Sequence, residues 1–224
     1  MGSFIQSNLG SSNNNFELVV LERQGLAHYH RDNVDLSSNP SWVPTKTVTR
    51  NATGAGSLIQ STLDSATNLE LVVLQGTDMV HYWRDNEGKW HPTAVAITSR
   101  ASGSGSLIQN TSGTRGNFEL IVREDNELYH FYRDNSNSAI PWHRCRVITN
   151  RATARGALVQ NSGRAATAPG NLDVVVLEAN LLVHYYHDSP DYMQPWHRAA
   201  TITEEATGPG SLIRSSRGVQ EDLK

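Results

Sequence analysis

Short apolar runs alternate along the chain with stretches that are rich in Gly, Ser, Asn and Thr. Runs such as "FELVVL" and "DVVVLE" are rich in β-branched residues, and turn residues such as "RQG" and "QGTD" bound them. This pattern is typical of β-strands, and no amphipathic helical period extends beyond about two turns. The apolar runs are also too short to cross a bilayer. The pattern therefore predicts an all-β protein.

The same strings recur with a period of about 50 residues, which is typical of a propeller. A "GSLIQS"-like string begins at Gly2, Gly56, Gly105, Gly156 and Gly210, at nearly equal intervals. Each full unit continues with a string like "NLELVV", a string like "HYWRDN" and a tryptophan. Four strands in each unit of this length predict a small β-propeller with four antiparallel strands in each blade. A β-sandwich or a trefoil is the alternative, but a trefoil needs threefold repetition.

We expect one domain over residues 1–224. Its repeats are predicted at 2–55, 56–104, 105–155 and 156–209, followed by a terminal strand at 210–216 and a tail at 217–224. Closing four blades needs only one of the two terminal copies of the first string. The surplus copy either covers a sheet edge or swaps into a partner chain, which would give a homodimer.

An acid precedes a shared histidine by the same distance in all four repeats. This constant spacing predicts a rigid two-strand unit with a fixed turn. We interpret the histidines as structural joints, each a buried neutral imidazole bonded to backbone, because buried polar groups need partners. The pairs are Glu17–His28, Glu70–His81, Glu119–His130 and Asp173–His184.

The positions that vary between repeats are the candidates for ligand binding. One asymmetric ligand would require such departures from symmetry, although drift explains them equally well. The glutamine that closes each "GSLIQ" string is expected to line the axial channel, with Arg214 as the odd member. The ligand-binding candidates are His30, Trp83, Arg84, Tyr132, Arg133, Tyr186 and His187, together with the repeated tryptophans Trp90, Trp142 and Trp196.

Composition excludes several functions. The formal charge of −3 and the lack of a basic cluster argue against nucleic-acid binding, and the single cysteine, Cys145, excludes an internal disulfide. No basic segment followed by an apolar run opens the chain, so we expect a cytoplasmic protein, with secretion by an unconventional route left open. No metal-binding motif, phosphate-binding loop or nucleophile elbow occurs, so we expect no cofactor or metal and identify no catalytic residue.

The run "GSLIQS…NLELVV…MVHYWRDN…W" resembles the repeats of lectin-like propellers of the fucose-binding type. This resemblance covers residues 2–216. It implies a glycan bound between adjacent blades, with an aromatic ring stacked on the sugar and with Arg and Glu or Asp bonded to its hydroxyls.

The repeats also resemble, more weakly, fungal hetero-Diels–Alderases that join a tropolone quinone methide to a humulene-type terpene. That resemblance implies a cofactor-free enzyme with one aromatic-lined pocket and a hydrogen-bond donor. A lectin should keep equivalent sites in several repeats, whereas an enzyme should break the symmetry once. We predict binding of a glycan or other small ligand, with the enzyme and a protein-interaction scaffold as alternatives.

Overall fold

The computed structural model describes residues 2–9, 15–33, 41–63, 68–112, 114–136, 141–161, 170–188 and 192–213. These residues form sixteen strands and no helix. Accordingly, none of the described segments is a helix that could span a membrane. The strands make four antiparallel sheets of four strands, arranged as a four-bladed β-propeller. The predicted fold class is confirmed.

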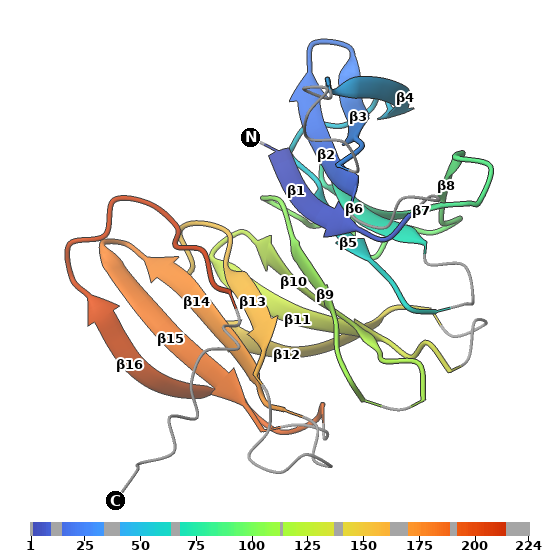
Figure 1. Ribbon diagram of the computed structural model, residues 1–224. Helices are drawn as coiled ribbons and strands as arrows, with labels where there is room; N and C mark the ends of the chain where they lie inside the picture. The colour runs from blue at the N-terminus through green and yellow to red at the C-terminus, as the bar shows by residue number, and fades with distance from the viewer. Residues whose placement is uncertain are drawn as a thin grey trace, which may run out of the picture.

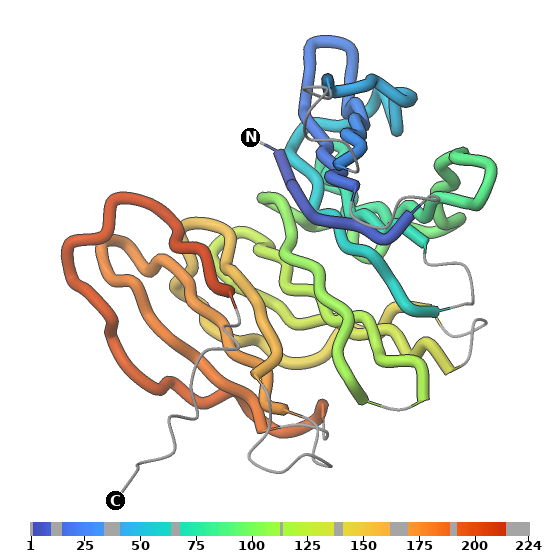
Figure 2. The backbone as a smooth tube through the Cα atoms, viewed as in Figure 1, coloured from blue at the N-terminus to red at the C-terminus, as the bar shows by residue number. Residues whose placement is uncertain are grey.

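Each sheet is a meander in which consecutive strands pair, and Figure 2 follows the chain from one sheet to the next. Blade 1 contains β1 (Gly2–Ser7), β2 (Asn15–Glu22), β3 (Gly25–Arg31) and β4 (Val43–Thr49). Blade 2 contains β5 (Ser57–Gln60), β6 (Leu69–Gln75), β7 (Asp78–Arg84) and β8 (Trp90–Pro92). Blade 3 contains β9 (Ser106–Gln109), β10 (Phe118–Glu124), β11 (Glu127–Arg133) and β12 (His143–Thr149). Blade 4 contains β13 (Ala157–Gln160), β14 (Leu172–Glu178), β15 (Leu181–His187) and β16 (His197–Thr203).

The hairpin between the second and third strands of each blade has the same short turn. In blades 2, 3 and 4 the first turn residue has a positive φ, as tight hairpins of this kind require. The three residues are Gly76, Asp125 and Ala179, with φ of 64°, 55° and 57°. Because the turn length never changes, the acid and the histidine are diagonal neighbours across the two strands in every blade.

Consecutive blades are linked through their innermost strands, which lie side by side in the order β1, β5, β9 and β13. A serine hydroxyl of one inner strand accepts a hydrogen bond from a backbone N–H of the next, for example Ser57 Oγ from Leu107 at 3.0 Å. The glycine that opens the fourth repeat also lies close to the preceding blade. A Cβ on Gly156 would lie 2.7 Å from Ile121 Cδ1 of β10, closer than real side chains come.

The hydrophobic core is divided among the three boundaries between consecutive blades. One cluster joins Val19 and Leu26 of blade 1 to apolar residues of blade 2. A second cluster joins blades 2 and 3, and a third joins blades 3 and 4. Both faces of blades 2 and 3 are therefore buried, which explains the nearly continuous apolar runs of their second strands.

Blades 1 and 4 stand at the two ends of this series (Figure 1). Within the described ranges no contact comparable to those between neighbouring inner strands joins β13 to β1. The surplus "GSLIRS" copy is not a strand over 210–213, and a Cβ on Gly210 would lie 3.3–3.6 Å from the side chains of Leu182 and Val175 in blade 4. Both interpretations of that copy, the covering of a sheet edge and the swap into a partner chain, stay predictions. Residues 214–216 lie outside the described part.

Candidate functional site

The shared histidine of each blade binds the acid of the neighbouring strand. The Nε2 atom of His28 lies 2.8 Å from Glu17 Oε2, and that of His81 lies 2.8 Å from Glu70 Oε2. The pairs His130–Glu119 and His184–Asp173 have separations of 2.7 and 2.8 Å. The expected backbone partner of the histidine is thus replaced by a carboxylate.

The innermost strand of each blade, or the residue that directly follows it, supplies the second partner of that carboxylate. Ser7 and Ser61 donate through their hydroxyls to Glu17 and Glu70 at 2.8 and 3.1 Å. Asn110 and Asn161 play the same part in blades 3 and 4. In blades 1 and 2 the serine donates to the acid and not to the histidine. The serine, the acid and the histidine therefore form a structural network and not a nucleophile–base pair.

The repeated tryptophan completes the joint from the following blade. Its ring meets the histidine of the preceding blade edge-on, with ring centroids 5.5–5.7 Å apart and planes at 87–88°. The three contacts are His28–Trp90, His81–Trp142 and His130–Trp196. These tryptophans lie in the joints and do not line the cavity described next.

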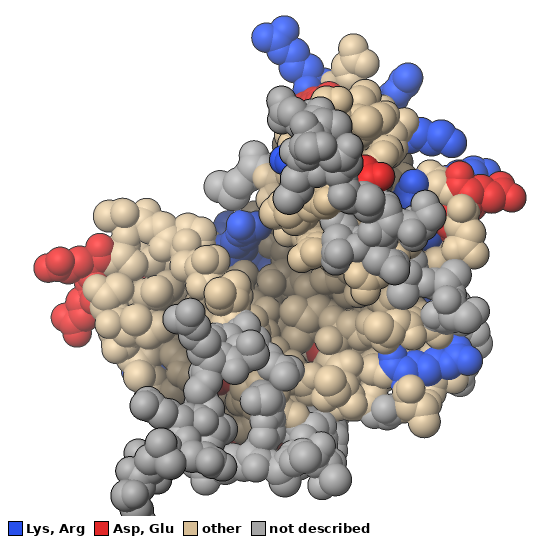
Figure 3. All heavy atoms as spheres, in the orientation of Figure 1, with Lys and Arg blue, Asp and Glu red and all other residues tan. Residues whose placement is uncertain are grey.

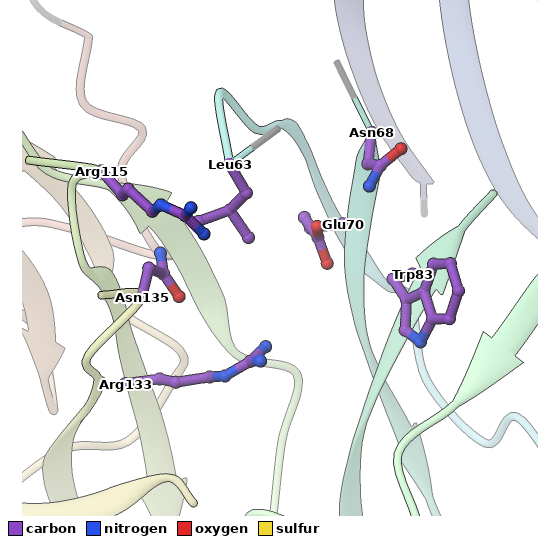
Figure 4. A pocket seen from close by; sticks show the side chains of 7 residues that line it. All are labelled: Leu63, Asn68, Glu70, Trp83, Arg115, Arg133 and Asn135. Carbon is purple, nitrogen blue, oxygen red and sulfur yellow. The ribbon is translucent and has the colours of Figure 1, made fainter. Parts of the chain in front are cut away.

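A cavity of about 220 Å³ opens between blades 2 and 3. Blade 2 contributes Trp83 from β7 and Glu70 from β6, and blade 3 contributes Arg133 from β11 (Figure 4). Four further residues complete the lining: Leu63, Asn68, Arg115 and Asn135. Two of the predicted site residues, Trp83 and Arg133, are therefore brought together here from different repeats.

Trp83 lines this cavity and stacks on a histidine of the next strand. The partner is His91, the cross-strand neighbour of Trp83, with centroids 4.5 Å apart and planes at 21°. Trp83 is 38% exposed, which is unusual for so large an apolar group. The cross-strand pairs Tyr132–His143 and Tyr186–His197 repeat this stack in blades 3 and 4.

Arg133 brings positive charge toward the buried carboxylate of Glu70. Burial lowers the pKa of Arg133, and the negative charge of Glu70 opposes that change. Its guanidinium lies over the Phe118 ring at 5.8 Å and makes no hydrogen bond to the described residues. Donors left without a protein partner in this way can bind an oxygen-rich ligand.

The equivalent space between blades 3 and 4 is filled by Tyr192. Its ring stacks on Tyr132 with centroids 3.8 Å apart and planes at 7°. Its hydroxyl donates to Glu119 Oε1 at 2.8 Å and accepts a bond from Asn117 Nδ2 at 2.9 Å. Burial and the nearby charge of Glu119 raise the pKa of Tyr192, so the phenol remains protonated.

The other candidates are distributed over the remaining boundaries. The repeat places His30 of blade 1 at the position of Trp83, and Arg84 of blade 2 at the position of Arg133. His187 stands where other blades have arginine, and burial lowers its pKa. Tyr186 lies on blade 4, the last blade that the described residues form. Their roles in ligand binding stay predictions.

Sequence reasoning missed Tyr192, Asn68, Arg115 and Asn135. Asn68 belongs to the repeated "NLELVV" string and could have been found there. Tyr192 lies in the connector between β15 and β16, and the corresponding connectors of the other repeats contain no aromatic residue apart from the repeated tryptophan. Periodicity therefore offered no signal for it.

The glutamines do not line the axial hollow, which measures about 350 Å³ and is bounded by the first residues of the inner strands and by 210–212. Their side-chain amides point between blades, because Gln60 Oε1 accepts the backbone N–H of Asn8 at 2.9 Å and Gln109 repeats this bond with Thr62. Arg214 lies outside the described residues. The expectation of a glutamine-lined channel is therefore corrected.

The described residues support neither a reactive thiolate nor a metal site. Burial, assisted by Glu119, raises the pKa of the Cys145 thiol to about 12, which leaves almost no thiolate at neutral pH. No group of three His, Cys, Asp or Glu side chains in the described ranges is arranged to hold a metal ion.

No protein-family model matches the sequence, and a comparison with curated proteins finds no match. Similar solved structures include a triple arginine-to-alanine mutant of AofleA from Arthrobotrys oligospora, with 10% identity and a TM-score of 0.59 over 89% of this chain and 56% of that chain. The chain thus spans little more than half the length of AofleA. The catalytic domain of the Coprinopsis cinerea GH62 α-L-arabinofuranosidase is 12% identical, with a TM-score of 0.54 over 96% of this chain and 73% of that chain.

The Aleuria aurantia lectin, in complex with Fucα1-6GlcNAc, is 11% identical over 92% of this chain and 80% of that chain. Its TM-score of 0.40 is too low to support an inference. At these identities the comparisons show the propeller fold alone.

Proposed function

We propose that this propeller binds carbohydrate in the cavity between blades 2 and 3. The observation that carries the proposal is that one cavity is lined by Trp83 and Glu70, which are cross-strand neighbours on blade 2, and by Arg133 from blade 3. A flat aromatic face suits the apolar face of a sugar ring, while a carboxylate acceptor and guanidinium donors suit its hydroxyls. Five of the seven lining side chains are polar or charged and can bond the hydroxyls of a polyhydroxylated ligand.

The alternative of a cofactor-free cycloaddition would need one apolar pocket that orients two hydrocarbon partners. This alternative stays a prediction. The same holds for an interaction scaffold.

The proposal is tested by titrating the purified protein with glycans that a glycan array selects. Trp83→Ala should weaken binding roughly tenfold or more, because it removes the stacking face. Arg133→Ala should weaken binding to a similar extent by removing charge-assisted donors. Arg133→Lys should restore only part of it, because lysine keeps the charge but loses the planar arrangement of donors.

Tyr132→Ala provides the matched control. Tyr132 holds the position of Trp83 in the next repeat, but Tyr192 covers its face. Glycan affinity should therefore be nearly unchanged in Tyr132→Ala. Equal losses in the Trp83 and Tyr132 variants would contradict the assignment of the site to this one boundary.

A further inference from the structure

Tyr192 shows how this protein holds a phenol. Between blades 3 and 4 three rings form a stack, His143–Tyr132–Tyr192, in which the third ring comes from a connector and not from a strand. The phenolic hydroxyl ends between a carboxylate and an amide, Glu119 and Asn117. Tyr192 belongs to the chain, but its ring stacking and hydroxyl bonds are the contacts that a bound phenol would make.

The same set of groups lies between blades 2 and 3 without the third ring. Asn68, Glu70 and Trp83 hold the same positions in their repeat as Asn117, Glu119 and Tyr132 hold in the next. His91 and Trp83 reproduce the first two layers of the stack. The exposed face of Trp83 and the cavity of about 220 Å³ beside it take the place of Tyr192.

The hydrogen-bonding groups in this cavity can also accept a phenol. In blade 3, Glu119 Oε1 receives bonds from both Asn110 and Tyr192. In blade 2, Glu70 Oε1 receives only the bond from Ser61 among the described residues. A carboxylate oxygen has two lone pairs, so Glu70 can accept a further O–H donor.

We infer that the cavity between blades 2 and 3 binds small phenols, with the aromatic ring on Trp83 and the hydroxyl between Glu70 and Asn68. A cavity of about 150 Å³ in another protein binds benzene, so a volume of about 220 Å³ is sufficient for one substituted ring. This ligand class goes beyond the proposed glycan, and the two ligands should compete because they use the same face of Trp83.

The probe is p-cresol, which is the side chain of tyrosine as a free molecule. Binding to the full chain is followed by ligand-observed NMR and by tryptophan fluorescence. Trp83→Ala should reduce the affinity for p-cresol roughly tenfold, since it removes the stacking partner. 4-Methylanisole, which has the same ring but no O–H donor, should bind more weakly than p-cresol. Equal binding of both compounds would overturn the assigned role of Glu70.

A second variant tests the equivalence of the two boundaries. Tyr192→Ala should vacate the space beside Tyr132 and add a second p-cresol site, so the stoichiometry should rise from one to two. Added p-cresol should also raise the melting temperature of Tyr192→Ala more than that of the wild type, whereas Tyr192→Phe should stay filled and gain no site.

If Tyr192→Ala binds p-cresol and the wild type does not, the cavity between blades 2 and 3 is not equivalent and the inference is wrong. If the wild type binds p-cresol but no glycan, the proposed function is wrong and the inference about phenols stands. If glycan binds and p-cresol does not, only the inference about phenols fails.

Discussion

At the scale of single residues, identical side chains carry the structure and different ones define the site. The acid, the histidine and the tryptophan repeat because every blade boundary needs the same joint. Trp83 and Tyr192 each occur once in their positions, and they account for the difference between an open cavity and a filled one. The repeat pattern could not predict that Tyr192 fills the space between blades 3 and 4, because this tyrosine occurs in only one repeat.

The joint makes a stability prediction for His81. The imidazole is fully buried, and its removal leaves the carboxylate of Glu70 without one of its two partners. His81→Ala should therefore lower the free energy of unfolding by about 1–3 kcal/mol. Chemical denaturation measures this loss. A variant of unchanged stability would contradict the structural role.

At the scale of elements, the sequence predicted the strands and their order well. Alternation and turn residues define the hairpins, and the constant spacing between the acid and the histidine follows from the uniform tight turns of the structure. The direction in which the glutamines point was predicted wrongly, because period alone does not say whether an inner-strand side chain faces the axis or the neighbouring blade. The set of residues that lines each space between blades could not be predicted from the sequence. Each space combines residues from two repeats, and the repeat pattern does not show which residues of neighbouring blades come into contact.

The tryptophans allow a matched comparison between elements. Trp142 is half-buried and packs against His81 of the preceding blade, whereas Trp42 in the equivalent position of blade 1 contacts no preceding blade among the described residues and is 37% exposed. Trp142→Ala should therefore cost up to about 3 kcal/mol of unfolding free energy, less than the truncation of a fully buried tryptophan. Trp42→Ala should cost much less. Equal effects in thermal and denaturant unfolding would mean that Trp42 is also buried in a joint.

At the scale of the whole molecule, the two terminal blades differ from the inner ones. His184 of blade 4 is 33% exposed at its side chain, while the corresponding histidines of the other blades are fully buried. Figure 3 shows basic side chains over blade 1 and acidic ones at the outer end of blade 4. Exposed Lys46 and Arg50 lie on the first of these blades and exposed Glu204 and Glu205 follow β16 of the last. The homodimer expected from the surplus terminal copy stays a prediction.

A lengthened chain tests whether the joints are independent of one another. An extra copy of residues 56–104 inserted after Ser104 would place Trp90 of the new blade against His81 of the old one, which recreates the joint with the same residues. Such nearest-neighbour interfaces predict a folded five-blade chain. Circular dichroism should show only strand, and small-angle scattering should show a larger particle. Aggregation or loss of the cooperative transition would contradict this independence.

The three joints also bear on how such a chain could have arisen. Each requires a histidine and an acid from one unit and a tryptophan from the next, and one unit carries all three. A gene segment that encodes a single blade is therefore compatible with its own copies at both ends. Tandem duplication could extend the protein without a coordinated second mutation, and each new boundary would begin with a space that later substitutions could leave open or, as Tyr192 does, fill.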